Sequence, residues 1–250
     1  MRTEELVRYL DDYLRTADVP DDARALNGLQ VEGGSEVTRV GVAVDAAERT
    51  IREAVARGCD FLIVHHGLFW DGNVPLTGRR YRKVSALLGA GVALYASHLP
   101  LDVHPAVGNN AVLAARVGIE VRGSFGLYKG VEIGIWGDLE IGREALTARL
   151  DDLLGGRIRL VPGGPERIVR AGVVTGAGAD MIGQAAALGV DAFITGEGPH
   201  HTYFDGLEGG VNVYFGGHYA TETWGVRALG EHLGRELGLS WEFLDLPTGT

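Results

Sequence analysis

The chain has 250 residues, of which 46% are hydrophobic, so it is long enough to bury one large core or two small ones. Its formal net charge of -10 opposes broad electrostatic attachment to nucleic acid or to anionic membranes. Cys59 is the single cysteine, which excludes an intramolecular disulfide, and neither a signal core nor an apolar run of the ~20 residues that span a membrane is present, so we expect a cytoplasmic protein.

The first half of the chain alternates helix and strand patterns. Apolar residues at spacings of three and four from Leu6 to Leu14 predict an amphipathic helix, and Asn27-Gly28 predicts a turn. The expected strands are 29–33, 40–44, 61–64 and 91–97, and the expected helices are 46–57 and 79–88. Apolar strands between helices are typical of a largely parallel sheet that is covered on both faces.

The second half of the chain continues this alternation. The expected helices are 109–117, 143–154 and 223–237, and the expected strands are 157–161 and 210–217. The stretch 123–137, rich in glycine and aromatic residues, is the best candidate for a boundary between lobes. The predicted fold is α/β, with two similar, closely packed lobes at 1–125 and 126–250 that can exchange elements.

An internal repeat supports two similar lobes. Residues 39–66 align without a gap on 170–197, at an offset of 131, and ten of the 28 positions are identical. The identical pairs include Asp60 with Asp191, inside a shared Gly-x-Asp. Generic α/β patterning could mimic duplication, but it rarely keeps one offset through helix and loop alike. We therefore expect matching strand ends of the two lobes to face one cleft.

Two short patterns pair a histidine with a carboxylate four residues later: His98 with Asp102, and His218 with Glu222. Each pattern follows a strand-like stretch that opens with Gly-Val, and His65-His66 closes another strand. Groups at the carboxyl ends of strands line the ligand crevice of an open α/β sheet. If His218 begins a helix, the spacing of four places Glu222 on the same face one turn later.

The number of these groups favours a metal site over isolated structural histidines. Imidazole and carboxylate ligands suit zinc, iron or manganese, and the absence of clustered thiolates disfavours copper(I) and iron-sulfur centres. Six groups exceed the needs of one tetrahedral zinc ion. A two-metal centre, about 3.5 to 4 Å across, would use them.

Several segments together resemble the NIF-three-like dinuclear-metal family, whose members are often described as type-two homologues of GTP cyclohydrolase one. The resemblance covers nearly the full length, in the short form without the domain that some members insert between the lobes. The matching segments are Asn27-Gly-Leu-Gln-Val-Glu-Gly33, Val64-His-His-Gly-Leu-Phe-Trp70, Ser97-His-Leu-Pro-Leu-Asp102, Gly108-Asn-Asn110, Thr195-Gly-Glu197 and Gly217-His-Tyr-Ala-Thr-Glu222.

The resemblance implies five protein ligands for two divalent metal ions, and a homohexameric toroid with the metal sites facing an internal cavity. The implied ligands are His65, His66, Asp102, His218 and Glu222. His98 is outside this set, so we assign it to a supporting position or to proton transfer. Its place in the repeat alone would have made it a ligand.

Other polar segments have two interpretations each. Glu197 aligns with His66. In one interpretation it has a function, as the group that orients a ligand or as a general base. In the other it is a structural carboxylate at a strand end. Thr175-Gly-Ala-Gly178 lacks the third glycine of a dinucleotide fingerprint and the lysine of a P-loop, so a tight turn is favoured. The basic run Arg79–Lys83 is either the solvated start of a helix or a phosphate-steering rim.

Two functions from different classes remain open. The first is a hydrolase in which metal-activated water attacks a small-molecule substrate, with the guanine ring of GTP as the substrate that the family label implies. The second is a metal-binding or delivery protein, or a protein-interaction protein, without turnover. Nucleic acid and membrane partners are disfavoured by the net charge.

Overall fold

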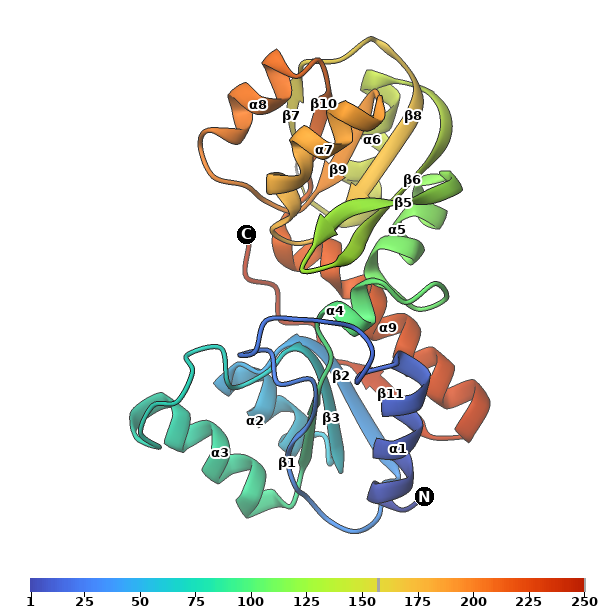
Figure 1. The fold of residues 1–250 in the computed structure, drawn as a ribbon. Coiled ribbons are helices and arrows are strands. Elements are labelled where there is room, and N and C mark those ends of the chain that lie inside the picture. The colour runs from blue at the N-terminus through green and yellow to red at the C-terminus, as the bar shows by residue number, and fades with distance from the viewer. Residues whose placement is uncertain (157, 250) are drawn as a thin grey trace. The chain divides into compact units, whose positions relative to one another are not determined.

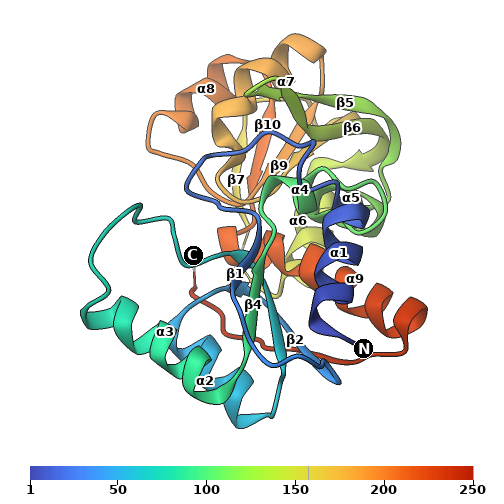
Figure 2. The ribbon, with the colours of Figure 1, turned by 60° about the horizontal axis from the view of Figure 1, so that its bottom comes forward.

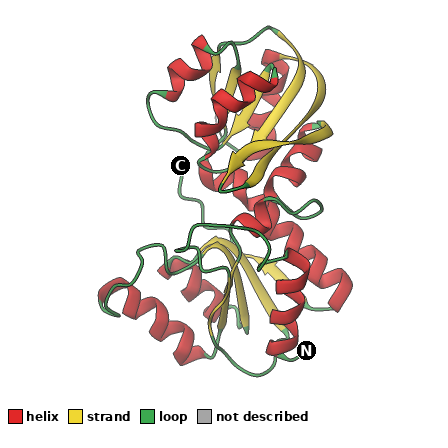
Figure 3. Cartoon of the chain, in the orientation of Figure 1, coloured by secondary structure: helices red, strands yellow, loops and turns green. Residues whose placement is uncertain are grey.

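Two sheets, each within its own unit, organise the chain. The computed structural model describes residues 1–156 and 158–249. Unit 1 contains Met1–Val107 and Gly225–Leu246, and unit 2 contains Gly108–Trp224 with residues 247–249. Figure 1 follows the chain by colour, and Figure 3 distinguishes the helices and strands of the α/β fold.

The sheet of unit 1 is largely parallel, as the strand pattern predicts. Its strand order is β1-β4-β3-β2-β11, and only β1 runs antiparallel to its neighbour. Figure 2 views these strands from another side. Their bounds are β1 (Gly28–Val31), β2 (Arg39–Asp45), β3 (Phe61–His66), β4 (Ala93–Ala96) and β11 (Ser240–Phe243).

The helices of unit 1 cover this sheet with apolar faces. In the first helix, Leu6, Leu10 and Leu14 are buried at a spacing of four, and each contributes about 1.5 to 3 kcal/mol relative to an exposed position. The helices are α1 (Thr3–Leu14), α2 (Glu48–Ala56), α3 (Gly78–Ala90) and α4 (Leu99–Asp102), with the part of α9 (His218–Leu237) that follows Gly225.

The sheet of unit 2 is mixed, with the order β5-β6-β8-β9-β10-β7. Only β8, β9 and β10 run parallel to one another. The strands are β5 (Glu120–Tyr128), β6 (Val131–Gly142), β7 (Arg159–Pro162), β8 (Arg167–Val174), β9 (Ala192–Thr195) and β10 (Asn212–Phe215). The helices are α5 (Asn109–Val117), α6 (Arg143–Leu154), the 3-10 turn η1 (Gly178–Met181), α7 (Ile182–Leu188) and α8 (Thr202–Glu208).

Two segments of unit 2 differ from the sequence-based expectation. The stretch 123–137 contributes to the hairpin β5–β6, and β6 pairs in turn with β8, so this stretch lies inside the unit. The described part of the strand expected at 157–161 falls mostly in β7, while Arg157 lies outside the described residues. The division of the chain also differs from a boundary at residue 125, because β5 pairs within unit 2 and β11 pairs with β2 in unit 1.

One turn has the same construction in both units. The carboxylate of Asp60 accepts hydrogen bonds from the backbone N–H groups of Thr38 and Arg39, at 2.8 and 3.0 Å. The carboxylate of Asp191 accepts from those of Val169 and Arg170 at the same two distances. In each unit the acid before one parallel strand therefore holds the backbone of the neighbouring one, at the start of β2 in unit 1 and within β8 in unit 2.

None of the helices in residues 1–156 and 158–249 combines the length and the apolar character that a membrane span requires.

Candidate metal site

Three histidines of unit 1 converge at one edge of its sheet. His65 and His66 end β3, and His98 immediately precedes α4, shortly after β4. Since β3 and β4 are neighbouring parallel strands, their carboxyl ends meet at the same edge. One ring nitrogen from each histidine lies within 4.8 Å of the others. The fold thus gathers imidazoles that are up to 33 residues apart in the chain.

Each of these histidines binds an oxygen acceptor through Nδ1. The acceptor of His65 is the carbonyl oxygen of Ser97, at 2.9 Å. His66 and His98 each have a carboxylate oxygen at 2.9 Å, from Asp45 and Asp21 respectively. A neutral imidazole that donates from Nδ1 has its lone pair on Nε2, which is the tautomer that a metal-binding histidine needs.

Asp102 is the carboxylate of unit 1 that belongs to the implied ligand set. It ends the short helix α4, where its backbone N–H donates to the carbonyl oxygen of His98 at 3.1 Å. Its Oδ2 lies 3.6 Å from Nε2 of His65, and the side chain is buried. The spacing of four from His98 therefore brings the carboxylate back to the histidines through one helical turn.

A network that the sequence analysis missed holds His98. Asn27 donates to Asp21 at 2.8 Å and accepts from the backbone N–H of His98 at 2.7 Å, while Asp21 also accepts from the N–H of Leu99. Burial alone would raise the pKa of Asp21, but hydrogen bonding and charge from His98, with the bonds from Asn27 and Leu99, outweigh it and lower that pKa. In the sequence, Asn27-Gly28 predicts a turn at this position but gives no sign that Asn27 contacts His98.

Gln30 fixes the turn that follows the paired histidines. Its Oε1 accepts from the backbone N–H of Leu68 at 2.8 Å, and its Nε2 donates to the carbonyl oxygens of Ala25 and Leu26 at 2.9 and 3.0 Å. A Cβ at Gly67 would overlap the Gln30 amide. A side chain at position 67 would therefore displace the Gln30 amide from these bonds.

Unit 2 presents one histidine between two carboxylates. His218 begins α9, and its Nε2 lies 3.1 Å from Oε2 of Glu222 on the next turn, the geometry that their spacing predicts. Its Nδ1 lies 2.7 Å from Oε1 of Glu197, just after β9. Burial would lower the pKa of His218, but the hydrogen bonds and charges of Glu222 and Glu197 outweigh it and raise that pKa to about 9.

The glycine-rich segment 175–178 is a tight turn beside this histidine. Gly176 has a φ of 63°, and its N–H donates to Thr221 Oγ1 at 3.0 Å. A Cβ at Gly176 would overlap the Glu222 carboxylate. The turn therefore leaves room for that carboxylate, as the tight-turn interpretation expects, and no phosphate-binding role is needed to explain its glycine.

The basic run at the start of α3 is paired with acids or buried. Arg79 lies 3.0 Å from Asp71, and Arg82 lies 2.8 Å from Glu48. Arg80 is buried against backbone carbonyl groups. The acidic partners of Arg79 and Arg82 fit the interpretation as the charged start of a helix, while Arg80 has no acidic partner within ion-pair distance among the described residues.

A protein-family model described as Duf34/NIF3 (NGG1p interacting factor 3) matches residues 1–248. The chain belongs to this family. Its DUF34/NIF3 relatives include two proteins named GTP cyclohydrolase 1 type 2 homolog. The one from Deinococcus radiodurans is 44% identical over 98% of this chain and 94% of its own length. The one from Archaeoglobus fulgidus is 43% identical over 99% of each chain.

Solved structures share the fold of this DUF34/NIF3 chain. Protein ybgI, described as of unknown function, has a TM-score of 0.93 at 38% identity, with both chains fully covered. A protein from Thermus thermophilus has a TM-score of 0.89 at 42% identity, again over both full lengths. Reduced HcgD from Methanocaldococcus jannaschii has a TM-score of 0.86 at 25% identity over 98% of each chain.

The donor chemistry of the DUF34/NIF3 chain fits a divalent first-row metal ion. Unit 1 supplies three imidazoles and a carboxylate, and unit 2 supplies one imidazole and a carboxylate on neighbouring turns. The carbonyl and carboxylate groups on Nδ1 are the outer partners that typically orient metal-binding histidines. The donors contain no thiolate, because the single cysteine, Cys59, is buried and burial raises its pKa to about 11.

Proposed function

We propose that this protein is a hydrolase with a dinuclear metal centre in the cleft between two lobes that descend from one repeated unit. The proposed ligands are His65, His66, Asp102, His218 and Glu222, holding two ions of zinc, iron or manganese. One observation carries the proposal: the three proposed ligand histidines, His65, His66 and His218, all engage an oxygen acceptor through Nδ1. Such a pattern prepares Nε2 to bind a metal ion.

The chemistry divides between the metal ions and the protein. Two divalent ions would lower the pKa of water toward roughly 7 and polarise an electrophilic carbon or phosphorus group. His98 is outside the ligand set, and its Nδ1 is held by Asp21, so we assign its Nε2 to hold or transfer a proton. Glu197 orients His218 through Nδ1. The name of these relatives, GTP cyclohydrolase 1 type 2 homolog, makes GTP the first substrate to test.

We further propose that the protein works in the cytoplasm as a homohexamer. The family resemblance is what supports this part of the proposal. Mass photometry of the untagged protein at micromolar concentration tests the assembly. A mass of six chains is expected, and a monomer or dimer under the same conditions would overturn it.

The test of the metal centre is elemental analysis of protein purified without an affinity tag or added metal. Wild type is expected to carry about two first-row metal ions per chain. Glu222→Ala should lose metal clearly, whereas Glu231→Ala, an exposed change on the same helix, should not. Metal near zero, still absent after incubation with zinc, iron and manganese, would overturn the metal centre.

A second measurement separates the hydrolase from a metal-delivery or protein-interaction role. The same donors could hold metal without turnover, and the family description itself records an interacting factor. Saturable turnover of a nucleotide, abolished in Asp102→Ala, supports the hydrolase. Transfer of bound metal to an acceptor protein, with no turnover of a substrate panel, supports delivery instead.

A further inference from the structure

Unit 1 contains a cavity lined by two segments that also hold its histidines, although none of the three histidines lines it. Its volume is about 380 Å³. Two loops form most of its wall: one lies before β1, and the other joins β3 to α3. The lining residues are Ala23, Arg24, Leu26, Phe69, Gly72, Asn73, Val74, Leu76 and Arg80.

The walls of this cavity are largely apolar and partly open to solvent. Leu26, Val74 and Leu76 are 52%, 42% and 52% exposed, which is high for large aliphatic side chains. Leu26 also has a φ of 44°, a strained angle for a residue with a branched side chain. The Gln30 bond to its carbonyl oxygen helps to hold it there. The strain and exposure coincide at a cavity wall, where binding a ligand would bury apolar surface.

The charge of the cavity is positive in a protein of net charge -10. Its lining has two arginines and no acid. Arg24 is paired with Asp22 at 2.9 Å. Arg80 is 7% exposed and donates to the carbonyl oxygens of Val74 and Gly72, both at 2.9 Å.

No carboxylate in the described part of the chain forms an ion pair with Arg80, and its Nε has no hydrogen-bond acceptor there. Asp71, an acid of the same loop, is paired with Arg79 instead. Asp71 contributes only a longer-range charge to Arg80, so an anion in the cavity would be stabilised by the buried guanidinium. Its guanidinium also lies 5.1 Å from the centre of the Phe69 ring.

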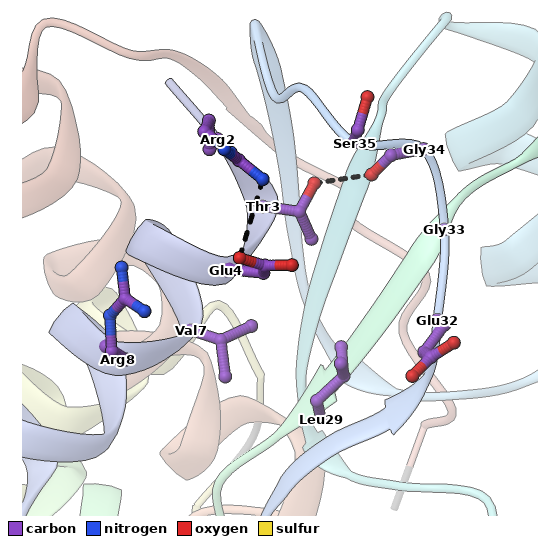
Figure 4. Close-up of a pocket in the computed structure, with 10 residues that line it drawn as sticks. All are labelled: Arg2, Thr3, Glu4, Val7, Arg8, Leu29, Glu32, Gly33, Gly34 and Ser35. Carbon is purple, nitrogen blue, oxygen red and sulfur yellow. Dashed lines mark hydrogen bonds and ion pairs between the residues drawn. The ribbon is translucent and has the colours of Figure 1, made fainter.

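A second cavity of unit 1 shows that this charge pattern is not general. It has a volume of about 410 Å³ and lies beside the start of α1 (Figure 4). Its charged lining residues balance one another and are Arg2, Glu4, Arg8 and Glu32. A third cavity, in unit 2, has three acids and one arginine in its lining. Of these three cavities, only the one formed by the loops before β1 and after β3 has arginines and no acid in its lining.

Both walls of the positive cavity are continuous with residues that hold the histidines. The loop through Leu26 lies between Asp21 and Asn27, which bind His98. The loop through Phe69 directly follows His66, and Trp70 packs edge-on against His98 with ring centres 4.9 Å apart. The cavity is therefore built on the segments that position the candidate ligands.

We propose that this cavity binds the recognition end of the substrate, an apolar or aromatic body that carries an anionic group, carboxylate or phosphate. The apolar body lies against Leu26, Val74, Leu76 and Phe69, and the anionic group lies near Arg80. This assignment deepens the proposed hydrolase function and rests on it. It makes the cavity a determinant of specificity, separate from the metal-binding donors.

The test measures binding by calorimetry to the full-length protein, with its metal and after chelation. The probes are phenyl phosphate and benzoate, with inorganic phosphate and neutral benzyl alcohol for comparison. Asn73→Asp adds a negative charge to the lining with little change in shape, and Leu76→Asp adds one at an exposed wall. Leu88→Asp is the matched control, since Leu88 is 60% exposed on α3 and outside the cavity.

Wild type is expected to bind phenyl phosphate or benzoate at least about tenfold more tightly than benzyl alcohol, with and without metal. Preference between the two anions identifies the anionic group. Each cavity variant should weaken binding about tenfold or more, with metal content and circular dichroism unchanged, while Leu88→Asp should match wild type.

Binding that disappears on chelation, or that inorganic phosphate reproduces, would place the anion on the metal and overturn the cavity assignment. Unchanged binding in both cavity variants would overturn it as well. Probe binding is also measured without metal. The result for the cavity therefore does not depend on whether elemental analysis finds a metal centre. A cavity that fails the test equally leaves the metal centre standing.

Discussion

The strand ends of the two units occupy aligned positions but carry different chemistry. In unit 1, Asp45 ends β2 and its carboxylate accepts a hydrogen bond from His66 at the end of β3. At the offset of 131, the aligned residues of unit 2 are Gly176 and Glu197. Gly176 leaves room for the Glu222 carboxylate, and Glu197 accepts from His218.

The contrast with Asp60 and Asp191 shows what each kind of position does. These two acids make the same backbone hydrogen bonds in both units, so they maintain the path of the chain. The strand-end positions carry different side chains in the two units. Unit 1 has Asp45 and His66 there, and unit 2 has Gly176 and Glu197, which lie beside His218 and its partner Glu222.

The largest expected effect comes from a substitution at Gly176, a strand-end position of unit 2. Gly176→Ala adds a Cβ where the Glu222 carboxylate lies and keeps a positive φ that costs an L-residue about 1 to 2 kcal/mol. We expect a loss of at least about 3 kcal/mol in the free energy of unfolding, measured in urea, and reduced metal content.

Gly189→Ala is the control for this change. Gly189 has a φ of 77°, and a Cβ there would meet no atom within 4 Å. It should therefore cost only the backbone strain and retain metal. Equal effects of the two substitutions on stability and metal content would show that the Glu222 contact is unimportant.

The next largest effect is expected on metal affinity, from removing the carboxylates that bind Nδ1 of the histidines. Asp45→Asn and Glu197→Gln remove the carboxylates from Nδ1 of His66 and His218, and each should weaken metal affinity about 10- to 100-fold in a chelator competition. Asp21→Asn acts on His98, outside the proposed ligand set, and should change affinity by less than about threefold. A loss with Asp21→Asn as large as with the other two would make His98 a ligand.

The smallest expected effect concerns the two acids that hold the backbone, Asp60 and Asp191. Asp60 accepts a third hydrogen bond, from the Thr38 hydroxyl at 2.6 Å, which Asp191 does not have among the described contacts. We expect Asp60→Asn to cost about 1 to 3 kcal/mol and Asp191→Asn to cost less, from urea unfolding at neutral pH. A larger cost for Asp191→Asn would contradict this ranking.

The pH dependence of unfolding provides a second measurement on Asp60. Burial would raise the pKa of Asp60, but hydrogen bonds from the Thr38 side chain and from the Thr38 and Arg39 backbone outweigh it and lower that pKa. Its contribution to stability is therefore present above the unfolded value of about 3.9 and is lost as pH falls through the folded one. Asp60→Asn should narrow the stability difference between pH 7 and pH 3 relative to wild type.

Much of the fold follows from local patterns in the sequence. The spacing of Leu6, Leu10 and Leu14 predicts α1, and apolar runs predict β2 and β3, because burial of one face or of a whole strand leaves a short-range signature. The spacing of His218 and Glu222 likewise predicts their approach at 3.1 Å, since residues four apart in a helix share a face. Cys59 is buried, as its position at a strand entrance suggests.

Only the tertiary structure revealed the groups that hold these residues in place. Asp21 meets His98 across 77 residues, and Gln30 meets Leu68 across 38, so no spacing rule connects them. The pairing of β11 with β2, and the insertion of 123–137 into a sheet, depend in the same way on which surfaces pack together. Donor type and helical spacing are local properties, so the residues that can carry the chemistry are identifiable from the sequence. Tertiary packing decided which nitrogen each histidine presents and which cavity lies beside it, because both depend on contacts between distant segments.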